Sequence, residues 1–280
     1  MLKHDAEVCK DVERRPVIAL LTDFGYHDGY VGTMKGVIAS IAPHALLIDI
    51  THGVKPQSIT GASLILWGSY RYFPHGTIFC VVVDPTVGTE RYPIVVHTKR
   101  YTFVGPNNGV MSWAFDEDGV KIAIKITNRH FMIQPVSQTF HGRDIFAPVA
   151  AYIACGVKLT EFGDEIPEHE LERLPKLSAR RIGDRLVAEV VHIDWFGNAI
   201  TSLHMLEFKQ WLADVAPKAW KARVRGVEFD RLSNAYGDVP VGKPLIIFNS
   251  YGLLEIAVNC GNAANELGIK MGDEIVIEPM

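Results

Sequence analysis

The sequence is poor in cysteine, and its few cysteines form no recognisable motif. Only four are present among 280 residues, and none stands in a C-x-x-C pair: Cys9, Cys80, Cys155 and Cys260. This spacing offers no zinc knuckle and no dithiol redox motif, and it excludes a disulfide-rich scaffold. Free thiols in a reducing compartment are the simplest interpretation.

Long apolar runs and a strong excess of one charge are also missing. No uncharged apolar stretch approaches the roughly 20 residues that span a bilayer. The N-terminal Met-Leu-Lys-His-Asp lacks the apolar core of a signal peptide. The net charge of −4 gives no electrostatic case for binding nucleic acid. We therefore expect a cytoplasmic protein that has neither a membrane nor a nucleic acid as its partner.

Several catalytic signatures are absent as well. The chain contains no G-x-x-x-x-G-K-[ST], G-x-G-x-x-G, G-x-S-x-G or H-E-x-x-H. Their absence argues against a phosphate loop, a dinucleotide fingerprint, a serine-hydrolase elbow and a zinc protease site. None of the eleven histidines stands four residues from another, so we expect no metal site.

What is present is the composition of a globular chain with a large core. Hydrophobic residues make up 48% and charged residues 21%, a mild apolar excess that suits a buried subunit interface. In the first half, apolar strand-like runs alternate with helix-like segments, the pattern of right-handed crossovers and a parallel sheet. Strands are expected at 16–22, 45–50, 77–83, 94–97 and 101–104, and helices at 30–41, 56–72 and 144–154.

The second half has a different pattern. A charged, proline-punctuated stretch begins near Asp164 and is typical of a linker between domains. The short runs that follow predict a small β sandwich or barrel with one helix near 206–215. Its strands are expected at 186–193, 223–227, 245–248, 253–258 and 274–277. We thus predict an α/β fold with four parts: an extension (1–15), an α/β domain with a mainly parallel sheet flanked by helices (16–172), a linker (173–185) and a C-terminal β domain (186–280).

Polar loops follow the apolar strands of the first half, at the edge where open parallel sheets bind ligands. The loop 22–28, Thr-Asp-Phe-Gly-Tyr-His-Asp, offers carboxylates for a ribose diol, or else an Asx-turn and a helix cap. In the loop 84–91 an arginine follows an aspartate by seven residues, either as a structural ion pair or to hold a catalytic carboxylate ionised. The segment 140–144, Phe-His-Gly-Arg-Asp, brings a histidine to a helix start, where His141 is either structural or catalytic.

Two further loops lie in the second half. The segment 193–198, Ile-Asp-Trp-Phe-Gly-Asn, contains an asparagine that can read an adenine edge and aromatic rings that can stack on a base. The alternative is a turn with core aromatic residues. The segment 249–255, Asn-Ser-Tyr-Gly-Leu-Leu-Glu, alternates polar and apolar groups, as in a hairpin that lines a site or in an ordinary β-turn.

Together these segments resemble the S-adenosylmethionine hydroxide adenosyltransferases, also called adenosylmethionine hydrolases, which share a fold with fluorinase and chlorinase. The matching blocks are T-D-F-G-x-x-D-x-Y-V-G, D-P-x-V-G-T-x-R, F-H-G-R-D, I-D-x-F-G-N and N-S-x-G-x-L-E-I-A. Each block alone is weak, and the five in order over residues 16–280 are specific. The resemblance implies hydrolysis of S-adenosyl-L-methionine (SAM) without a cofactor. It also implies a homotrimer whose active sites form between the N-terminal domain of one subunit and the C-terminal domain of its neighbour.

The resemblance also implies roles for single residues. The family's catalytic triad falls on Asp84, Arg91 and His141. Substrate-binding positions fall on Asp23 at the ribose diol, Asp28 and Asp194 near the methionine amine, Phe196 and Asn198 at the adenine, Ser250 at the methionine carboxylate, and on Phe24, Phe140, Gly142 and Glu255. Two positions depart from the family pattern, which usually has glycine at Thr86 and often has aspartate at Asn107.

The reaction that the resemblance implies is SN2 attack of water or hydroxide on the ribose C5′ of SAM, giving adenosine and L-methionine. Either Asp84 or His141 takes the proton from water. Halogenating relatives carry an aromatic hydroxyl residue at the Asp84 position, and a fixed carboxylate there repels halide. A halogenase of the same fold and a non-catalytic SAM-binding protein are the alternatives. A nucleotide hydrolase acting on phosphates has no support because no phosphate loop is present.

Overall fold

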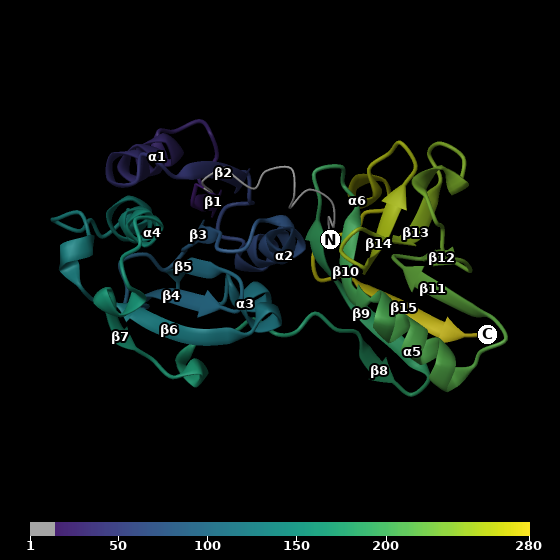
Figure 1. Ribbon diagram of the computed structural model, residues 1–280. Coiled ribbons are helices and arrows are strands. Elements are labelled where there is room, and N and C mark those ends of the chain that lie inside the picture. The colour runs from purple at the N-terminus through teal and green to yellow at the C-terminus, as the bar shows by residue number, and fades with distance from the viewer. Residues whose placement is uncertain (1–14) are drawn as a thin grey trace, which may run out of the picture. The chain divides into compact units, whose positions relative to one another are not determined.

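The computed structural model describes residues 15–280, which form two compact units divided between Leu174 and Pro175 (Figure 1). The expected extension 1–15 lies outside the described residues except for Arg15. The guanidinium of Arg15 donates hydrogen bonds to the carbonyls of His44 and Ala45. Within the described part of the chain, no helix has the length and apolar character to cross a membrane.

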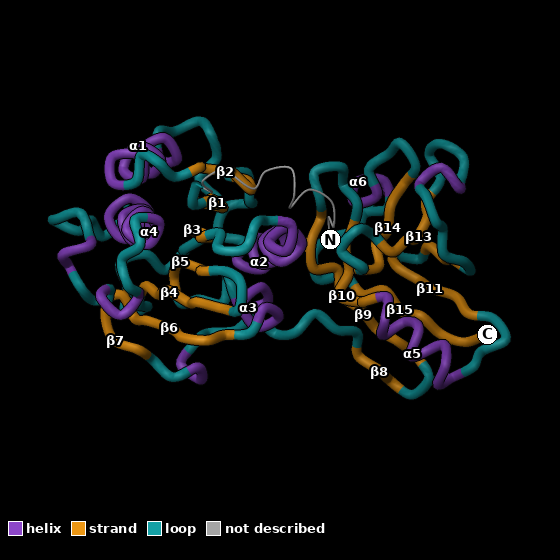
Figure 2. The backbone as a smooth tube through the Cα atoms, in the orientation of Figure 1, coloured by secondary structure: helices purple, strands orange, loops and turns teal. Residues whose placement is uncertain are grey.

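The first unit is built on a mixed seven-stranded sheet with the order β2-β1-β3-β5-β4-β6-β7 (Figure 2). The neighbours β2, β1, β3 and β5 are parallel, whereas β4, β6 and β7 extend the sheet in antiparallel fashion. The expectation of a mainly parallel sheet is therefore only partly correct. The turn between β4 and β5 is too short for a crossover and makes them a hairpin. The strands are β1 Val17–Thr22, β2 Leu46–Thr51, β3 Ile78–Val82, β4 Pro93–Thr98, β5 Thr102–Pro106, β6 Val120–Ile126 and β7 Gly163–Glu165.

Helices cover both faces of this sheet because its strands present apolar side chains alternately to either side. Ile18 and Leu20 of β1 pack in one core with α1 and α4, whereas Ala19 and Leu21 pack in a second core with α2 and α3. All four side chains are fully buried. The helices are α1 Tyr30–Ile41, α2 Ile59–Ser69, α3 Ser112–Asp118 and α4 Ala147–Ala154, the last preceded by a π-helical turn at Gly142–Phe146.

The second unit is an eight-stranded antiparallel sheet with the order β12-β11-β15-β9-β10-β14-β13, and β8 pairs with β9. Its strand β8 lies inside the segment expected to be a linker. The helix α5 packs Phe208 and Trp211 into the core of this unit. The elements are β8 Arg180–Ile182, β9 Arg185–Ile193, β10 Ala199–His204, α5 Met205–Val215, β11 Trp220–Val224, β12 Val227–Phe229, β13 Pro244–Phe248, β14 Leu253–Val258, α6 Ala263–Glu266 and β15 Glu274–Pro279.

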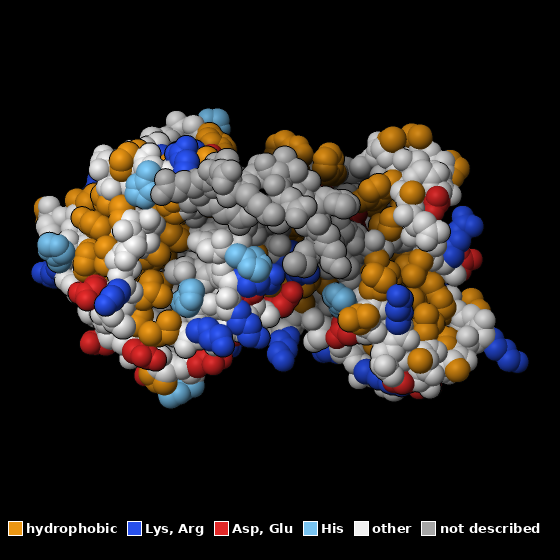
Figure 3. Space-filling model, in the orientation of Figure 1, with side chains coloured by type: hydrophobic (Ala, Val, Ile, Leu, Met, Phe, Trp, Pro, Cys, Tyr) orange, Lys and Arg blue, Asp and Glu red, His pale blue; other side chains and the backbone are white. Residues whose placement is uncertain are grey.

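The parallel strands deliver their carboxyl ends to one edge of the first sheet. Thr22 pairs with Val82 at the ends of β1 and β3, and Leu21 pairs with Thr51 at the end of β2. The loops that begin at Asp23 and Asp84 are therefore neighbours. Figure 3 shows basic, acidic and hydrophobic side chains interspersed over the visible face of the molecule, in keeping with its net charge of −4.

The interior strand β1 provides a test of this packing. Leu20 is fully buried between β1 and its helices, so Leu20→Ala should reduce the free energy of unfolding by about 2–5 kcal/mol through lost burial and a cavity. Urea denaturation followed by circular dichroism measures it. The control Leu46→Ala removes a leucine that is 43% exposed, and its effect should stay near or below about 1 kcal/mol. Equal losses in the two variants would contradict this description of the core.

Candidate active site

Three loops of the first unit converge at the carboxyl edge of its sheet, and two glycines allow them to touch. A Cβ added at Gly142 would lie 3.3 Å from the ring of Phe140 and 3.4 Å from that of Phe24. A Cβ added at Gly88 would collide with the carbonyl oxygen of Gln138, and the φ of Gly88 is +78°. Since both the close approach and the left-handed backbone require glycine at Gly88, the loop 84–91 is fixed against the segment 138–142.

Arg91 links Asp84 and His141, the other two residues of the triad that the resemblance implies. Its Nε donates to Asp84 Oδ1 at 3.0 Å, and its Nη2 contacts both Asp84 Oδ2 and, at 2.8 Å, His141 Nδ1. The side chains of Asp84 and Arg91 are only 5% and 8% exposed, so water screens their attraction weakly. The guanidinium also lies 5.4 Å from the ring centre of Phe146. The structure thus places these residues in a chain, with the arginine in the middle.

The contact with Arg91 fixes the proton of His141. A guanidinium can only donate hydrogen bonds, so Nδ1 of His141 must accept and the neutral ring carries its hydrogen at Nε2. Burial, together with the positive charge of Arg91, lowers the pKa of His141 and keeps the ring neutral near pH 7. The only basic lone pair of His141 is therefore already engaged by Arg91.

The loop after β1 presents the carboxylate of Asp23. Asp23 is half-buried, and its Oδ2 accepts the backbone N–H of Gln57 at 2.7 Å. Gln57 has a φ of +67°, an uncommon conformation for a residue other than glycine. The rings of Phe24, Tyr30 and Phe140 meet beside this loop, with centroids 5.1–5.8 Å apart. Asp28 lies exposed in the turn before α1.

Both departures from the family pattern have structural roles. The hydroxyl of Thr86 donates to Asp84 Oδ1 at 3.3 Å, so it adds a donor to the triad carboxylate. Asn107 is buried, donates to the carbonyl of Glu170 at 2.9 Å and accepts the N–H of Glu172 at 2.9 Å. An aspartate could not make the first of these bonds, because a carboxylate has no donor.

In the second unit, Asp194 organises the turn between β9 and β10. Its Oδ1 accepts the backbone N–H groups of Phe196 and Asn198 at 2.9 and 2.8 Å, and its Oδ2 accepts the side-chain amide of Asn198 at 3.1 Å. Asn198 is buried, whereas Phe196 is 72% exposed in the turn. Ser250 is exposed in the turn between β13 and β14.

Glu255 occupies the interior of β14 and is 2% exposed. Tyr236 donates to its Oε1 at 2.7 Å and the amide of Asn249 to its Oε2 at 3.1 Å. Burial raises the pKa of this carboxyl group. In the chain described here it supports the 249–255 turn from within rather than presenting a free carboxylate to solvent.

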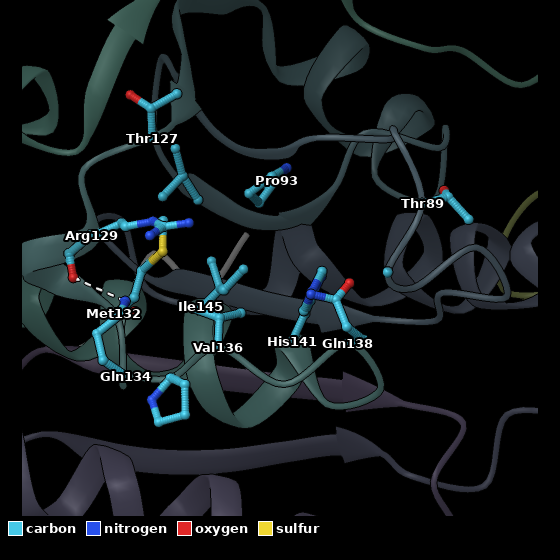
Figure 4. Close-up of a pocket in the computed structure, with 13 residues that line it drawn as sticks. Thr89, Pro93, Thr127, Arg129, Met132, Gln134, Val136, Gln138, His141 and Ile145 are labelled. Carbon is cyan, nitrogen blue, oxygen red and sulfur yellow. Dashed lines mark hydrogen bonds between the residues drawn. The ribbon is translucent and has the colours of Figure 1, made fainter.

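A cavity of about 480 Å3 reaches the triad from the side of His141. Figure 4 shows His141 beside Gln138 at one part of its wall and Arg129 beside Met132 at another. Most of the remaining wall is apolar and comes from β6, the segment 132–136 and the π-helical turn. Sequence reasoning missed this cavity, because most of its wall, apart from Gly88, Thr89 and His141, belongs to segments that carry no motif.

Comparisons with known proteins cover both units. The chain matches the family model of the SAM hydroxide adenosyltransferase N-terminal domain over residues 18–163 and that of the C-terminal domain over residues 188–276. The (R)-S-adenosyl-L-methionine hydrolase of Salinispora tropica is 37% identical over 93% of this chain and 97% of its own. A fluorinase of Actinoplanes sp. is 26% identical over 94% of this chain and 97% of its own. The crystal structure of an uncharacterized conserved protein from Thermotoga maritima has a TM-score of 0.83 at 41% identity, covering 93% of this chain and 99% of that one.

The proton of His141 can be followed directly. We expect the pKa of His141 to lie below its ordinary value of 6.5 in the wild type and to rise in Arg91→Gln, because the neighbouring positive charge is lost. Since the folded ring resists protonation, its contribution to stability is intact above pH 6.5 and is lost as the pH falls through the folded pKa. NMR of ¹³C-labelled histidine, with His141→Asn to assign the signal, measures the titration.

The control for this titration is Arg129→Gln, which removes an arginine that lines the same cavity as His141 and makes no hydrogen bond to its Nδ1 in the structure. It should leave the pKa of His141 unchanged. A wild-type value above 6.5, or a fall in Arg91→Gln, would contradict the assigned proton.

Proposed function

The chain belongs to the SAM hydroxide adenosyltransferase family, and on this premise we propose that it hydrolyses SAM to adenosine and L-methionine. The observation that carries the proposal is the shielded carboxylate of Asp84, held by Arg91 in the loop next to that of Asp23. A carboxylate suits water as the nucleophile because it can accept a proton, and it disfavours halide because like charges repel.

The proposed step is an in-line displacement at the ribose C5′. A water oxygen forms a bond to C5′ while the C5′–S bond breaks, and the bonding pair stays on sulfur, which leaves as a neutral thioether. No acid is needed for the leaving group. Asp84 orients the water and takes its proton as the new C5′–O bond forms. Because a protonated alcohol is a strong acid, even a carboxylate shared with an arginine can take that proton.

The other residues then have positioning roles. Arg91 holds Asp84 through two nitrogens, and His141 holds Arg91 in turn. Placing a weak nucleophile in line with the C5′–S bond is the main source of acceleration available here, and oriented reactants can lower a barrier by up to about 7–11 kcal/mol. Asp23 would accept the ribose hydroxyls, while Phe24 and Phe140 would pack against the nucleoside.

We further propose that the active unit is a homotrimer, with Asp194, Phe196, Asn198 and Ser250 of one subunit completing the site on the N-terminal unit of another. The exposed ring of Phe196 supports this assignment, because a large apolar group that projects from a turn is suited to an interface or a stacked base. Asp28 and Asp194 would then lie near the methionine amine. A cytoplasmic location fits a substrate made inside cells.

The nucleophile and the role of Asp84 can be tested together. Wild-type protein incubated with SAM in ¹⁸O-water should place the label in the 5′-hydroxyl of adenosine. Asp84→Ala should lower kcat by at least about 100-fold while SAM still binds, because proton acceptance and water placement are lost. The control Asp214→Asn removes the carboxylate of a surface Asp–Arg pair and should leave kcat unchanged. Unlabelled adenosine, or unchanged turnover in Asp84→Ala, would refute the mechanism.

The same assay separates the alternative functions. A halogenase would convert SAM to 5′-chloro- or 5′-fluoro-5′-deoxyadenosine when halide is added, and a binding protein would retain SAM without releasing methionine. Liquid chromatography with mass spectrometry distinguishes these products. The proposal predicts adenosine alone, at the same rate with or without chloride.

Subunit mixing tests the shared site. Asp84→Ala and Asn198→Ala should each be inactive alone. In a co-refolded equal mixture, random assembly gives about a quarter of the sites an intact N-terminal unit from one subunit and an intact C-terminal unit from another, so up to about a quarter of wild-type activity should return. Light scattering reports the oligomeric state. A mixture as inactive as its parents, or a monomeric active protein, would overturn the shared site.

A further inference from the structure

His52 is a buried polar residue that the proposed mechanism does not use. It follows β2 directly, and its ring is 1% exposed although an imidazole has two polar nitrogens. Burial of such groups is costly unless both find partners, so the contacts of His52 call for an explanation.

The contacts of the ring form a chain toward the end of β1. His52 Nδ1 lies 2.8 Å from the hydroxyl of Thr22, which is itself fully buried. On the other side, His52 Nε2 lies 3.1 Å from Asp49 Oδ1, and Lys35 donates to Asp49 Oδ2 at 2.6 Å. The half-exposed ion pair of Lys35 and Asp49 thus anchors one end of the chain, and Thr22 forms the other.

The hydrogens of this chain can be assigned in one direction. Burial lowers the pKa of His52, so the ring is neutral near pH 7. A neutral ring with its hydrogen at Nε2 faces Asp49 and accepts the Thr22 hydroxyl at Nδ1. The Thr22 oxygen keeps a lone pair, and the backbone N–H of Phe24 donates to it at 3.2 Å. At the other end of the chain, His52 Nε2 and Asp49 Oδ1 lie 3.1 Å apart without the geometry of a hydrogen bond, so the ring is held through its contact with Thr22.

The same histidine touches the substrate loop a second time. The N–H of Gly25 donates to the carbonyl of His52 at 2.8 Å, and the ring of Tyr26 stands edge-on to that of His52 with centroids 5.3 Å apart. Five residues further on, Gln57 donates its N–H to Asp23 Oδ2. The loops after β1 and β2 are therefore joined on both sides of Asp23, and His52 makes two of the three hydrogen bonds between them as well as the ring contact with Tyr26.

We propose that His52 is a positioning residue for ribose recognition: through Thr22 and through its own carbonyl, it holds the turn Asp23–Gly25 so that the Asp23 carboxylate meets the ribose diol of SAM. This inference rests on the proposed function and adds a residue outside the triad to it. Its hydrogen bonds go to Thr22 and Gly25, the two residues that flank Asp23 and Phe24.

The consequence is a specific kinetic signature. Asp23 contacts hydroxyls that do not react, so its contribution is the same before and during the displacement. His52→Leu should therefore raise KM for SAM by about 10-fold or more while kcat falls less than about 3-fold. Thr22→Val should do the same, and the double variant should add little, because both changes break one chain of bonds.

The affinity for nucleosides with and without the ribose hydroxyls gives a measurement that a general loss of structure would not change selectively. Calorimetry should show adenosine binding about 10-fold more weakly to His52→Leu than to the wild type, whereas 2′,3′-dideoxyadenosine, which lacks both hydroxyls, should bind the two proteins equally. His52→Asn offers an acceptor oxygen near the position of Nδ1 and should recover part of the adenosine affinity. The matched control is His97→Leu, which breaks a histidine–threonine contact of 3.0 Å in the β4–β5 hairpin, away from these loops, and should leave KM unchanged.

Each outcome decides between the alternatives. Wild-type KM in His52→Leu, or equal weakening of both nucleosides, overturns the positioning role and leaves hydrolysis of SAM intact. If His52→Leu does not fold by circular dichroism, Thr22→Val and His52→Asn carry the same test. If the wild-type protein binds adenosine but does not cleave SAM, the proposed function is wrong, and the comparison of adenosine with 2′,3′-dideoxyadenosine still tests the role of His52. A wild-type protein that does neither overturns both.

Discussion

The parallel pairing of β2, β1 and β3 is the constraint on which the candidate site depends. Because all three strands run in the same direction, their carboxyl ends meet at one edge, and Thr22, Thr51 and Val82 end in register. Asp23, His52 and Asp84 follow these ends within two residues, although 61 positions separate the first from the last. A hairpin sheet would have sent the loop after β2 to the opposite edge. The backbone hydrogen bonds between the strands therefore bring these three residues to one edge of the sheet, whatever contacts their side chains make.

The second determinant is an arginine placed between an acid and a base. Arg91 satisfies the carboxylate of Asp84 and the lone pair of His141 at once, so the position of the acid and the tautomer of the base have a common origin. This arrangement differs from a relay in which histidine abstracts a proton, because the histidine here has nothing left with which to accept one. The contacts of Arg91 thus keep the carboxylate of Asp84 in a fixed position. That suits a reaction whose leaving group needs no help and whose nucleophile is weak.

The sequence predicts those features that depend on local pattern. The run Val81-Val-Val83 before Asp84 indicates a buried strand that delivers a carboxylate, and the helix 30–41 follows from apolar spacing ended by Pro43. The direction of β4 is not encoded so locally, since a short apolar run is equally compatible with parallel and antiparallel neighbours. The alternation of apolar and polar residues in Val120–Ile126 also indicates a strand, β6, although the segment has no long continuous apolar run. His52 looks like any lone histidine until the fold brings Thr22 against it, because its partners other than Asp49 lie in β1 and the loop that follows β1.

The side-chain amide of Asn107 makes the structure sensitive to the chemical conversion of a single residue. It clips the segment that contains Glu170 and Glu172 to the end of β5 by donating and accepting at once. Side-chain amides are among the thermolabile groups of proteins, and conversion of this one to an acid would exchange a donor for a negative charge facing a carbonyl oxygen. The backbone would remain unbroken, yet the last stretch of the first unit would lose one of its links, while those to Tyr92, Asp116 and Ser112 would remain. Slow conversion of the Asn107 amide to a carboxylate would therefore change the structure without any substitution in the encoded sequence.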